Sequence, residues 1–182
     1  MTPTLKATDK IQYGFKRVTV ANLFEPDDHP AYPSRLRGES EKWVRECSKP
    51  QLTPGVPEEV AFLFETARGS MVYGLFFLPL AALATEEGFR VLEAGVRHRC
   101  KQLGLGKKKS GKADAFPEKP YLDLVDALHG AGKISEDELP IWKSMVGLRN
   151  NFSHRTSASI RARHEAIAQL AYIAELLNRL FK

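Results

Sequence analysis

The chain has 182 residues, of which 43% are hydrophobic, and this length is sufficient for one sizeable core with an additional segment. Its 27 basic and 22 acidic residues give a formal charge of +5, a modest surplus that alone does not establish nucleic-acid binding. The two cysteines, Cys47 and Cys100, are far apart and lack a CxxC spacing. This pattern argues against a disulfide framework or a cysteine metal site, so we expect reduced thiols.

Neither a signal peptide nor a membrane-spanning helix is expected. Met1 is followed by polar residues, without the apolar run of a signal peptide. The most apolar segment, 71–84, contains Gly74 and Pro79 and is too short to cross a bilayer, so we interpret it as a buried helix. We therefore expect a cytoplasmic protein without membrane contact.

Residues 1–50 differ in character from the rest and are predicted to form an N-terminal arm or extension. Residues 11–24 are rich in β-formers, which is typical of a short strand or an extended arm, and three prolines between 26 and 33 indicate a turn-rich loop. A short helix is predicted over 34–48, with Leu36, Trp43, Val44 and Cys47 on its apolar side. The run 27–29 (Asp-Asp-His) is interpreted as a turn in preference to a metal site, and no metal or cofactor is expected.

From Pro57 onward the pattern is helical. Proline followed by Glu58 and Glu59 favours a helix start, and Gly69, Gly74 and Pro79 indicate a break before the next helix. Apolar residues then recur at steps of three and four, which is the helical period. The first predicted stripe is Val60, Leu63, Phe64, Ala67 and Met71, and the second is Phe89, Leu92, Val96, Cys100 and Leu103.

Residues 104–119, with three glycines and a lysine run, are predicted to be a loop, and 121–129 a shorter helix. Ser135 and Glu138 match a capping box before the next helix. That helix has the predicted stripe Ile141, Met145, Leu148 and Phe152. The terminal helix has near-heptad spacing of Ile160, Ile167, Leu170, Ala174, Leu177 and Phe181.

The terminal helix also carries a second set of apolar residues, Ile173, Leu176 and Leu180. This surplus is expected to pack either against the N-terminal segment or against another subunit, and we favour the subunit. Together the elements predict an all-α protein: an antiparallel four- to five-helix bundle over 57–182, preceded by the extended, turn-rich arm.

The segment 149–154 (Arg-Asn-Asn-Phe-Ser-His) places a permanent cation, an amide and a titratable imidazole within two helical turns. An arginine can hold a phosphate through two parallel hydrogen bonds, and a histidine can transfer a proton near neutral pH. Those are the two tasks required to cut a phosphodiester without a metal. Residues five apart lie about 140° apart around a helix, so Arg149 must reach across to His154 or work with a second chain. Asn150 and His154, four apart, share a face.

These residues and their setting resemble the HEPN superfamily (higher eukaryotes and prokaryotes nucleotide-binding) over about 57–182. Its mark is an arginine followed four to six residues later by a histidine, often with asparagine directly after the arginine, near the end of a helix that precedes the terminal one. Arg149, Asn150 and His154 fit that pattern. The resemblance implies a two-fold dimer in which both copies of the motif face one cleft. It also implies metal-independent endoribonuclease activity, often in toxins or antiphage-defence effectors that act with an antitoxin or another defence protein.

On this hypothesis, His154 removes the proton from a ribose 2′-hydroxyl, Arg149 holds the phosphate and Asn150 orients the imidazole or binds a phosphate oxygen. Glu93 and Ser153 are the expected supporting residues. RNA contacts are predicted for the basic residues Lys107, Lys108, Lys109, Arg155 and Arg97, with His98 beside the RNA path.

Two alternatives remain open. Arg149 can instead pair with an acid of a neighbouring helix, for example Glu93, while His154 closes a helix C-terminus. A dimeric bundle with a basic cleft can also bind RNA or nucleotide, or dock a partner protein, without cutting.

Overall fold

A computed structural model describes residues 40–77, 79–105, 119–153 and 163–182, excluding the side chains of 150–153, 163 and 164. Its described part contains six helices and no strand: α1 (Ser40–Ser48), α2 (Glu58–Tyr73), α3 (Pro79–Gln102), α4 (Tyr121–Gly130), α5 (Leu139–Ser153) and α6 (Arg163–Leu180). The prediction of an all-helical bundle is therefore confirmed. The predicted N-terminal arm lies outside the described residues, except for α1, which matches the second part of the helix predicted over 34–48.

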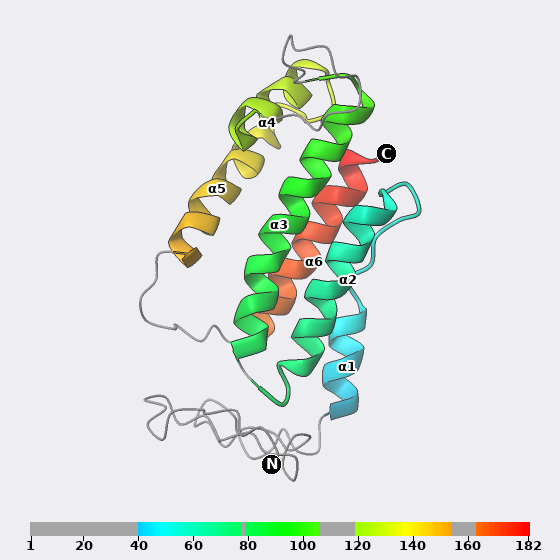
Figure 1. The fold of residues 1–182 in the computed structure, drawn as a ribbon, viewed down its shortest axis with the longest axis vertical. Helices are drawn as coiled ribbons and strands as arrows, with labels where there is room; N and C mark the ends of the chain where they lie inside the picture. The colour runs from blue at the N-terminus through cyan, green and yellow to red at the C-terminus, as the bar shows by residue number, and fades with distance from the viewer. Residues whose placement is uncertain (1–39, 78, 106–118, 154–162) are drawn as a thin grey trace, which may run out of the picture.

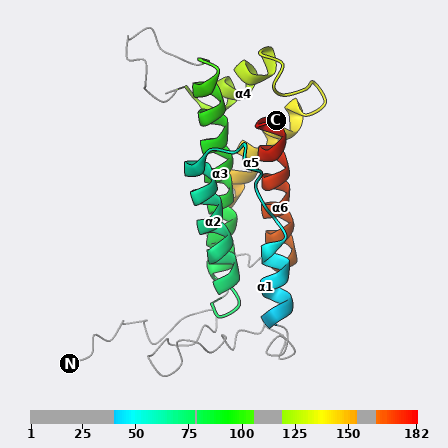
Figure 2. The same ribbon diagram turned by 90° about the vertical axis from the view of Figure 1, so that its right-hand side faces the viewer.

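Helices α2, α3 and α6 form the long body of the molecule, and α4 crosses one end of it (Figure 1). Helices α2 and α3 form an antiparallel hairpin, whereas α6 runs in the same direction as α3 (Figures 1 and 2). Helix α5 runs back along α3 towards the end where α6 begins (Figure 1), so the antiparallel arrangement predicted for the bundle does not extend to α3 and α6. Helix α5 lies on the side of α3 that faces away from α2 (Figure 1).

The hairpin between α2 and α3 follows from the glycine and proline signals in the sequence. Helix α2 begins after Pro57 with Glu58 and Glu59 in its first turn, and α3 begins at Pro79. Gly74 lies so close to α3 that a Cβ atom there would be only 3.0 Å from the Cβ of Ala81. The interpretation of 71–84 as one buried helix is therefore wrong: this segment is the end of α2, a turn and the start of α3. Met71, Leu75, Ala81 and Ala84 of this segment are buried, whereas Tyr73 and Leu83 are exposed.

Close packing of α3 against α6 depends on two glycines of α3. A Cβ atom at Gly88 would lie 2.8 Å from Ile173 Cδ1, and one at Gly95 would lie 2.2 Å from Leu177 Cδ2. Because carbon atoms normally approach to about 3.5–4.0 Å, no larger residue fits at either position without movement of α6 side chains. Gly95 and Glu93 are about 200° apart around α3. The glycine face therefore packs on α6, and the Glu93 face is directed towards α5.

The main core is formed by buried residues of α2 to α6, and a smaller one lies under α1. In the smaller core, Trp43 and Cys47 pack against the end of α2 and the starts of α3 and α6. The indole Nε1 of Trp43 donates a hydrogen bond of 3.0 Å to the carbonyl of Val72, which fixes α1 on α2. Val44, predicted to be on the apolar side of this helix, is instead 44% exposed.

Two further predictions about apolar stripes are corrected by the burial of side chains. Ile173, Leu176 and Leu180 are all buried within the chain, so the second apolar face of α6 belongs to the main core, and our preference for a subunit contact there is wrong. On α5 the buried residues are Trp142 and Met145, whereas Leu148 is 38% exposed. Leu103, predicted to be in the α3 stripe, is also exposed.

The turn between α4 and α5 is fixed by Glu138. As the capping box predicts, Ser135 Oγ accepts a hydrogen bond from the backbone N–H of Glu138 (3.3 Å), and the Glu138 carboxylate accepts one from the N–H of Ser135 (3.5 Å). The same carboxylate pairs with Arg179 of α6 at 3.0 Å. The start of α5 is thereby fixed to the end of α6, and its last turns are placed beside the middle of α3.

Candidate functional site

The arginine of the predicted motif lies on the surface of α5. The side chain of Arg149 is 53% exposed, and its Nη1 donates to Glu93 Oε2 of α3 at 3.1 Å. The pairing of Arg149 with Glu93, weighed from the sequence as the structural role of this arginine, is therefore confirmed.

Several other predicted site residues lie wholly or partly outside the described part of the chain. The backbone of Asn150 and Ser153 continues α5, but their side chains are outside the described part. His154, Arg155 and Lys107 to Lys109 also lie outside the described residues. Their predicted roles stay predictions.

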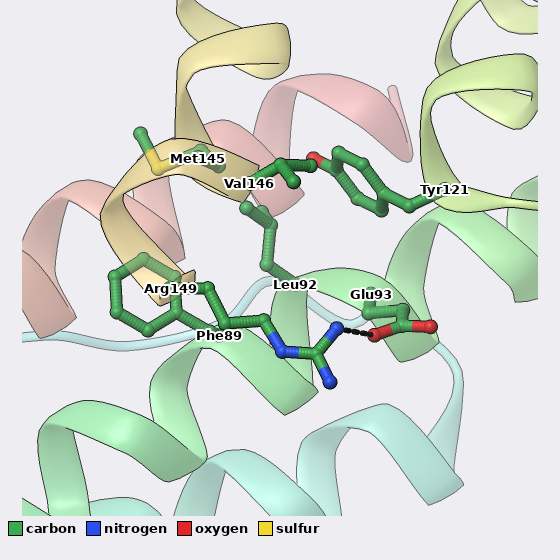
Figure 3. Close-up of a pocket in the computed structure, with 7 residues that line it drawn as sticks. All are labelled: Phe89, Leu92, Glu93, Tyr121, Met145, Val146 and Arg149. Atoms are coloured by element: carbon green, nitrogen blue, oxygen red, sulfur yellow. Dashed lines mark hydrogen bonds and ion pairs between the residues drawn. The ribbon is translucent and has the colours of Figure 1, made fainter. Parts of the chain in front are cut away.

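Glu93 joins two arginines from two different helices. Its Oε1 accepts hydrogen bonds from Arg97 Nε at 3.2 Å and Nη2 at 2.8 Å. Its Oε2 accepts the bond from Arg149, which Figure 3 shows as a dashed line. Arg97 Nη1 also donates to the carbonyl of Lys119 at 3.4 Å. We call Glu93, Arg97 and Arg149 the charge cluster. It has two guanidinium groups and one carboxylate, and hence a formal charge of +1.

An apolar hollow adjoins the charge cluster between α3, α4 and α5. Its lining is formed by the two cluster residues Glu93 and Arg149 together with Phe89, Leu92, Tyr121, Met145 and Val146 (Figure 3). Its volume of about 20 Å³ is sufficient for roughly one water molecule, so it cannot enclose a nucleobase or a nucleotide. Any substrate of this site must therefore lie over the hollow, on the surface of α3 and α5.

Tyr121 fixes the upper wall of this hollow. Its hydroxyl donates a hydrogen bond of 3.2 Å to the carbonyl of Trp142 on α5. Burial, together with the nearby negative charge of Glu93, raises the pKa of the Tyr121 phenol far above its usual range. The phenol is consequently a neutral structural donor near pH 7 and is not suited to act as a general acid or base. Tyr121 and Trp142 were missed in the sequence because nothing in their spacing links α4 to α5.

The described histidines have contacts of their own. His98 has its pKa lowered, mainly because burial disfavours the imidazolium, with Glu59 opposing that shift. The Nδ1 of His129 lies 2.9 Å from the carbonyl of Ile134, and its Nε2 lies 3.1 Å from Glu136. His129 therefore stabilises the turn after α4, and the expectation that His98 lies beside an RNA path is not tested by its position.

The thiols are poor candidates for nucleophiles or ligands. Both cysteines are free and buried, and burial raises the pKa of Cys47 to about 12 and that of Cys100 to about 11. A thiol with a pKa this high is almost entirely protonated at neutral pH.

No three His, Cys, Asp or Glu side chains among the described residues come together as candidate metal ligands. Of the helices described, none has the length and apolar character needed to cross a membrane.

The arrangement is chemically suited to binding an anion at the surface. Guanidinium groups bind phosphate oxygens through paired N–H donors, and two of them lie within contact of one carboxylate here. Arg149 contacts Glu93 through one nitrogen, and a guanidinium has five N–H donors in all, enough to bind a phosphate bidentately. Comparisons of the chain with protein-family models, curated proteins and solved structures found no match.

Proposed function

We propose that the protein is a metal-independent endoribonuclease of the HEPN type, with a composite active site formed by Arg149 and His154 of two copies of the chain. The observation that supports this proposal most is the charge cluster, which provides an exposed guanidinium from α5 next to a second one from α3. Such a pair is suited to hold the phosphate of an RNA backbone. In a cell, such an activity suits a toxin or antiphage-defence effector restrained by an antitoxin or another defence protein.

The chemistry requires two proton transfers and no metal. The neutral imidazole of His154 takes the proton of a ribose 2′-hydroxyl, and the 2′-oxygen attacks the adjacent phosphorus. The bond from phosphorus to the 5′-oxygen breaks, and that oxygen takes a proton from the imidazolium of the second copy. The products are a 2′,3′-cyclic phosphate and a 5′-hydroxyl. Arg149 offsets the charge that develops on the non-bridging oxygens.

The first test compares cleavage of a labelled RNA in EDTA by the wild-type protein and by single-residue variants. His154→Ala is expected to lower the rate by about a hundred- to ten-thousand-fold, because general acid–base help is lost. Arg149→Ala is expected to lower it by about a hundred- to a thousand-fold. An identical DNA strand should stay intact, because it lacks the 2′-hydroxyl.

Two control variants show whether a loss of activity is specific. Arg90 is an arginine of α3 that pairs with Glu87 and has a 74% exposed side chain, so Arg90→Ala removes the same charge as Arg149→Ala from a residue outside the charge cluster. His164→Ala removes another histidine. Both controls should retain activity within about twofold of the wild type; equal losses in Arg90→Ala and Arg149→Ala would contradict a specific phosphate contact.

The composite site also predicts a dependence on protein concentration. Cleavage per chain should fall when dilution separates the copies, with the midpoint matching the dimer dissociation measured by sedimentation. A monomeric protein that cuts RNA at the full rate would contradict the shared site.

The second candidate function is a dimeric module that binds RNA, nucleotide or a partner protein without cutting. It is favoured by the contact of Arg149 with Glu93, since an arginine used in a structural ion pair needs no catalytic role. Intact RNA together with salt-sensitive binding in the same assay would select this function.

A further inference from the structure

The Glu93 carboxylate takes up the guanidinium that a phosphate would use. A carboxylate and a phosphate oxygen accept from the same N–H donors of arginine, so they compete for them. In the charge cluster the competing bond is a single one, from Arg149 Nη1 to Glu93 Oε2 at 3.1 Å. Because this bond joins α5 to α3, it also holds the exposed arginine down on the surface of the bundle (Figure 3).

Release of Arg149 leaves Glu93 with a charged partner. Arg97, four residues along the same helix, binds the other carboxylate oxygen at 2.8 Å and 3.2 Å. Those bonds do not depend on α5 and persist when Arg149 turns away. The Arg149 side chain is already half exposed, and pairs of this kind are weak because water competes for both ions. The contact is therefore strong enough to direct the resting arginine and weak enough for a phosphate to replace it.

We infer that Glu93 is a competing anion built into the site, which holds Arg149 until the phosphate of an RNA displaces it. This inference rests on the proposed function, because it assigns a regulator to the same phosphate-binding arginine. Glu93 thus limits RNA affinity, and it is not itself a catalytic residue. The displaced carboxylate stays bound to Arg97.

The test uses an RNA whose 2′-hydroxyls are methylated, so that it binds without being cut. Glu93→Gln should bind this RNA about two- to fivefold more tightly than the wild type. That gain corresponds to about 0.4–1 kcal/mol, the strength of a partly exposed ion pair that the RNA no longer has to displace. Glu93→Met, which keeps the length of the side chain without its charge, should show the same gain, and circular dichroism verifies that both variants are folded.

Glu87→Gln is the matched control for charge. Glu87 is on the same helix, its side chain is 23% exposed against 25% for Glu93, and it also pairs with an arginine, Arg90. It is six residues away, or about 9 Å along the axis and about 240° around it, so it faces a different side of α3. Its neutralisation should change RNA affinity by less than about twofold at physiological salt.

The Arg149→Ala background separates competition from other roles of Glu93. If Glu93 acts by occupying Arg149, then Glu93→Gln has no effect on affinity once Arg149 is absent. Weaker binding by both Glu93 variants would overturn the inference, because it would mean that Glu93 positions the arginine. An equal gain in Glu87→Gln would also overturn it. If the wild type cuts RNA but Glu93→Gln leaves affinity unchanged, the inference fails and the proposed function stands. If Arg149→Ala leaves both binding and cleavage at the wild-type level, the proposed function fails as well.

Discussion

Replacing Gly95 by alanine tests the close approach of α3 and α6, on which the position of Glu93 depends. The new Cβ would lie 2.2 Å from Leu177 Cδ2, and 3.7 Å from both Leu177 Cγ and Phe181 Cε2. Reaching an ordinary contact of about 3.5 Å requires the methyl group of Leu177 to move by about 1.3 Å. Leu177 is fully buried, so this movement displaces its neighbours, and such overpacking typically costs about 1–3 kcal/mol.

Gly147→Ala is the matched control, because Gly147 is also inside a helix but has no neighbouring atom within 4 Å of the position that the new methyl group would take. Both substitutions gain helix propensity, up to about 1 kcal/mol, so the difference between the two variants isolates the packing term. Urea unfolding should find Gly95→Ala less stable than Gly147→Ala by about 1–3 kcal/mol. At this chain length, that corresponds to roughly 2–12 °C in Tm.

A double-mutant cycle identifies the atom responsible. In a Leu177→Ala background the clashing methyl group is gone, so Gly95→Ala should no longer destabilise the protein relative to that background. Equal stability of Gly95→Ala and Gly147→Ala in the wild-type background would refute the close packing of α3 on α6.

Three further predictions concern the positioning of the helices and the buried thiols. Trp43→Phe removes the hydrogen bond to Val72 that holds α1, and should lower the free energy of unfolding by about 0.5–1.5 kcal/mol, measured by urea denaturation. Glu138→Ala removes the capping box and the pair with Arg179, and should cost about 1 kcal/mol in the same assay, whereas Glu136→Ala, at an 85% exposed side chain, should cost less. The pKa values of Cys47 and Cys100 are raised to about 12 and about 11, so the folded state binds more protons than the unfolded state above about pH 9, and stability should fall as pH rises from about 9 to 11. Replacing both thiols by alanine should flatten that decline, and a thiol reagent at about pH 8 should react with the native wild type only as fast as it opens.

The helices themselves were predictable because their signals are local. Pro57 and the two glutamates after it mark the start of α2, and Ser135 with Glu138 marks the turn before α5. The apolar run 71–84 gives two predictions: its composition indicates one buried helix, whereas Gly74 and Pro79 indicate a break, and the break is confirmed. In this segment the helix-breaking glycine and proline predict the structure better than the mean hydropathy does.

Predictions that depend on which helices meet were less successful. The predicted stripe of α5 is only partly right: Met145 is buried and Ile141 packs against the main core, but Leu148 is exposed. Trp142 is buried and Val146 lines the hollow, although both lie outside that stripe, because α5 also packs against α3 and α4. The second apolar face of α6 likewise fits a subunit contact or the core, and the parallel packing on α3 selects the core.

The candidate site was also only partly predictable from the sequence. The spacing of Glu93 and Arg97, four apart, is visible in the sequence, and the pairing of Glu93 with Arg149 was one of two interpretations of that arginine. That one carboxylate binds both arginines through different oxygens is a tertiary property, because it needs α5 to pack beside the middle of α3.

The chemical ends left on a cut RNA test the central claim most directly. RNA is incubated with the protein in EDTA, and the new termini are identified by mass spectrometry. Attack by the 2′-hydroxyl, with Arg149 on the phosphate and His154 as the base, leaves a 2′,3′-cyclic phosphate on one fragment and a 5′-hydroxyl on the other. Fragments that carry a 3′-hydroxyl and a 5′-phosphate, or RNA that stays intact, would contradict the account.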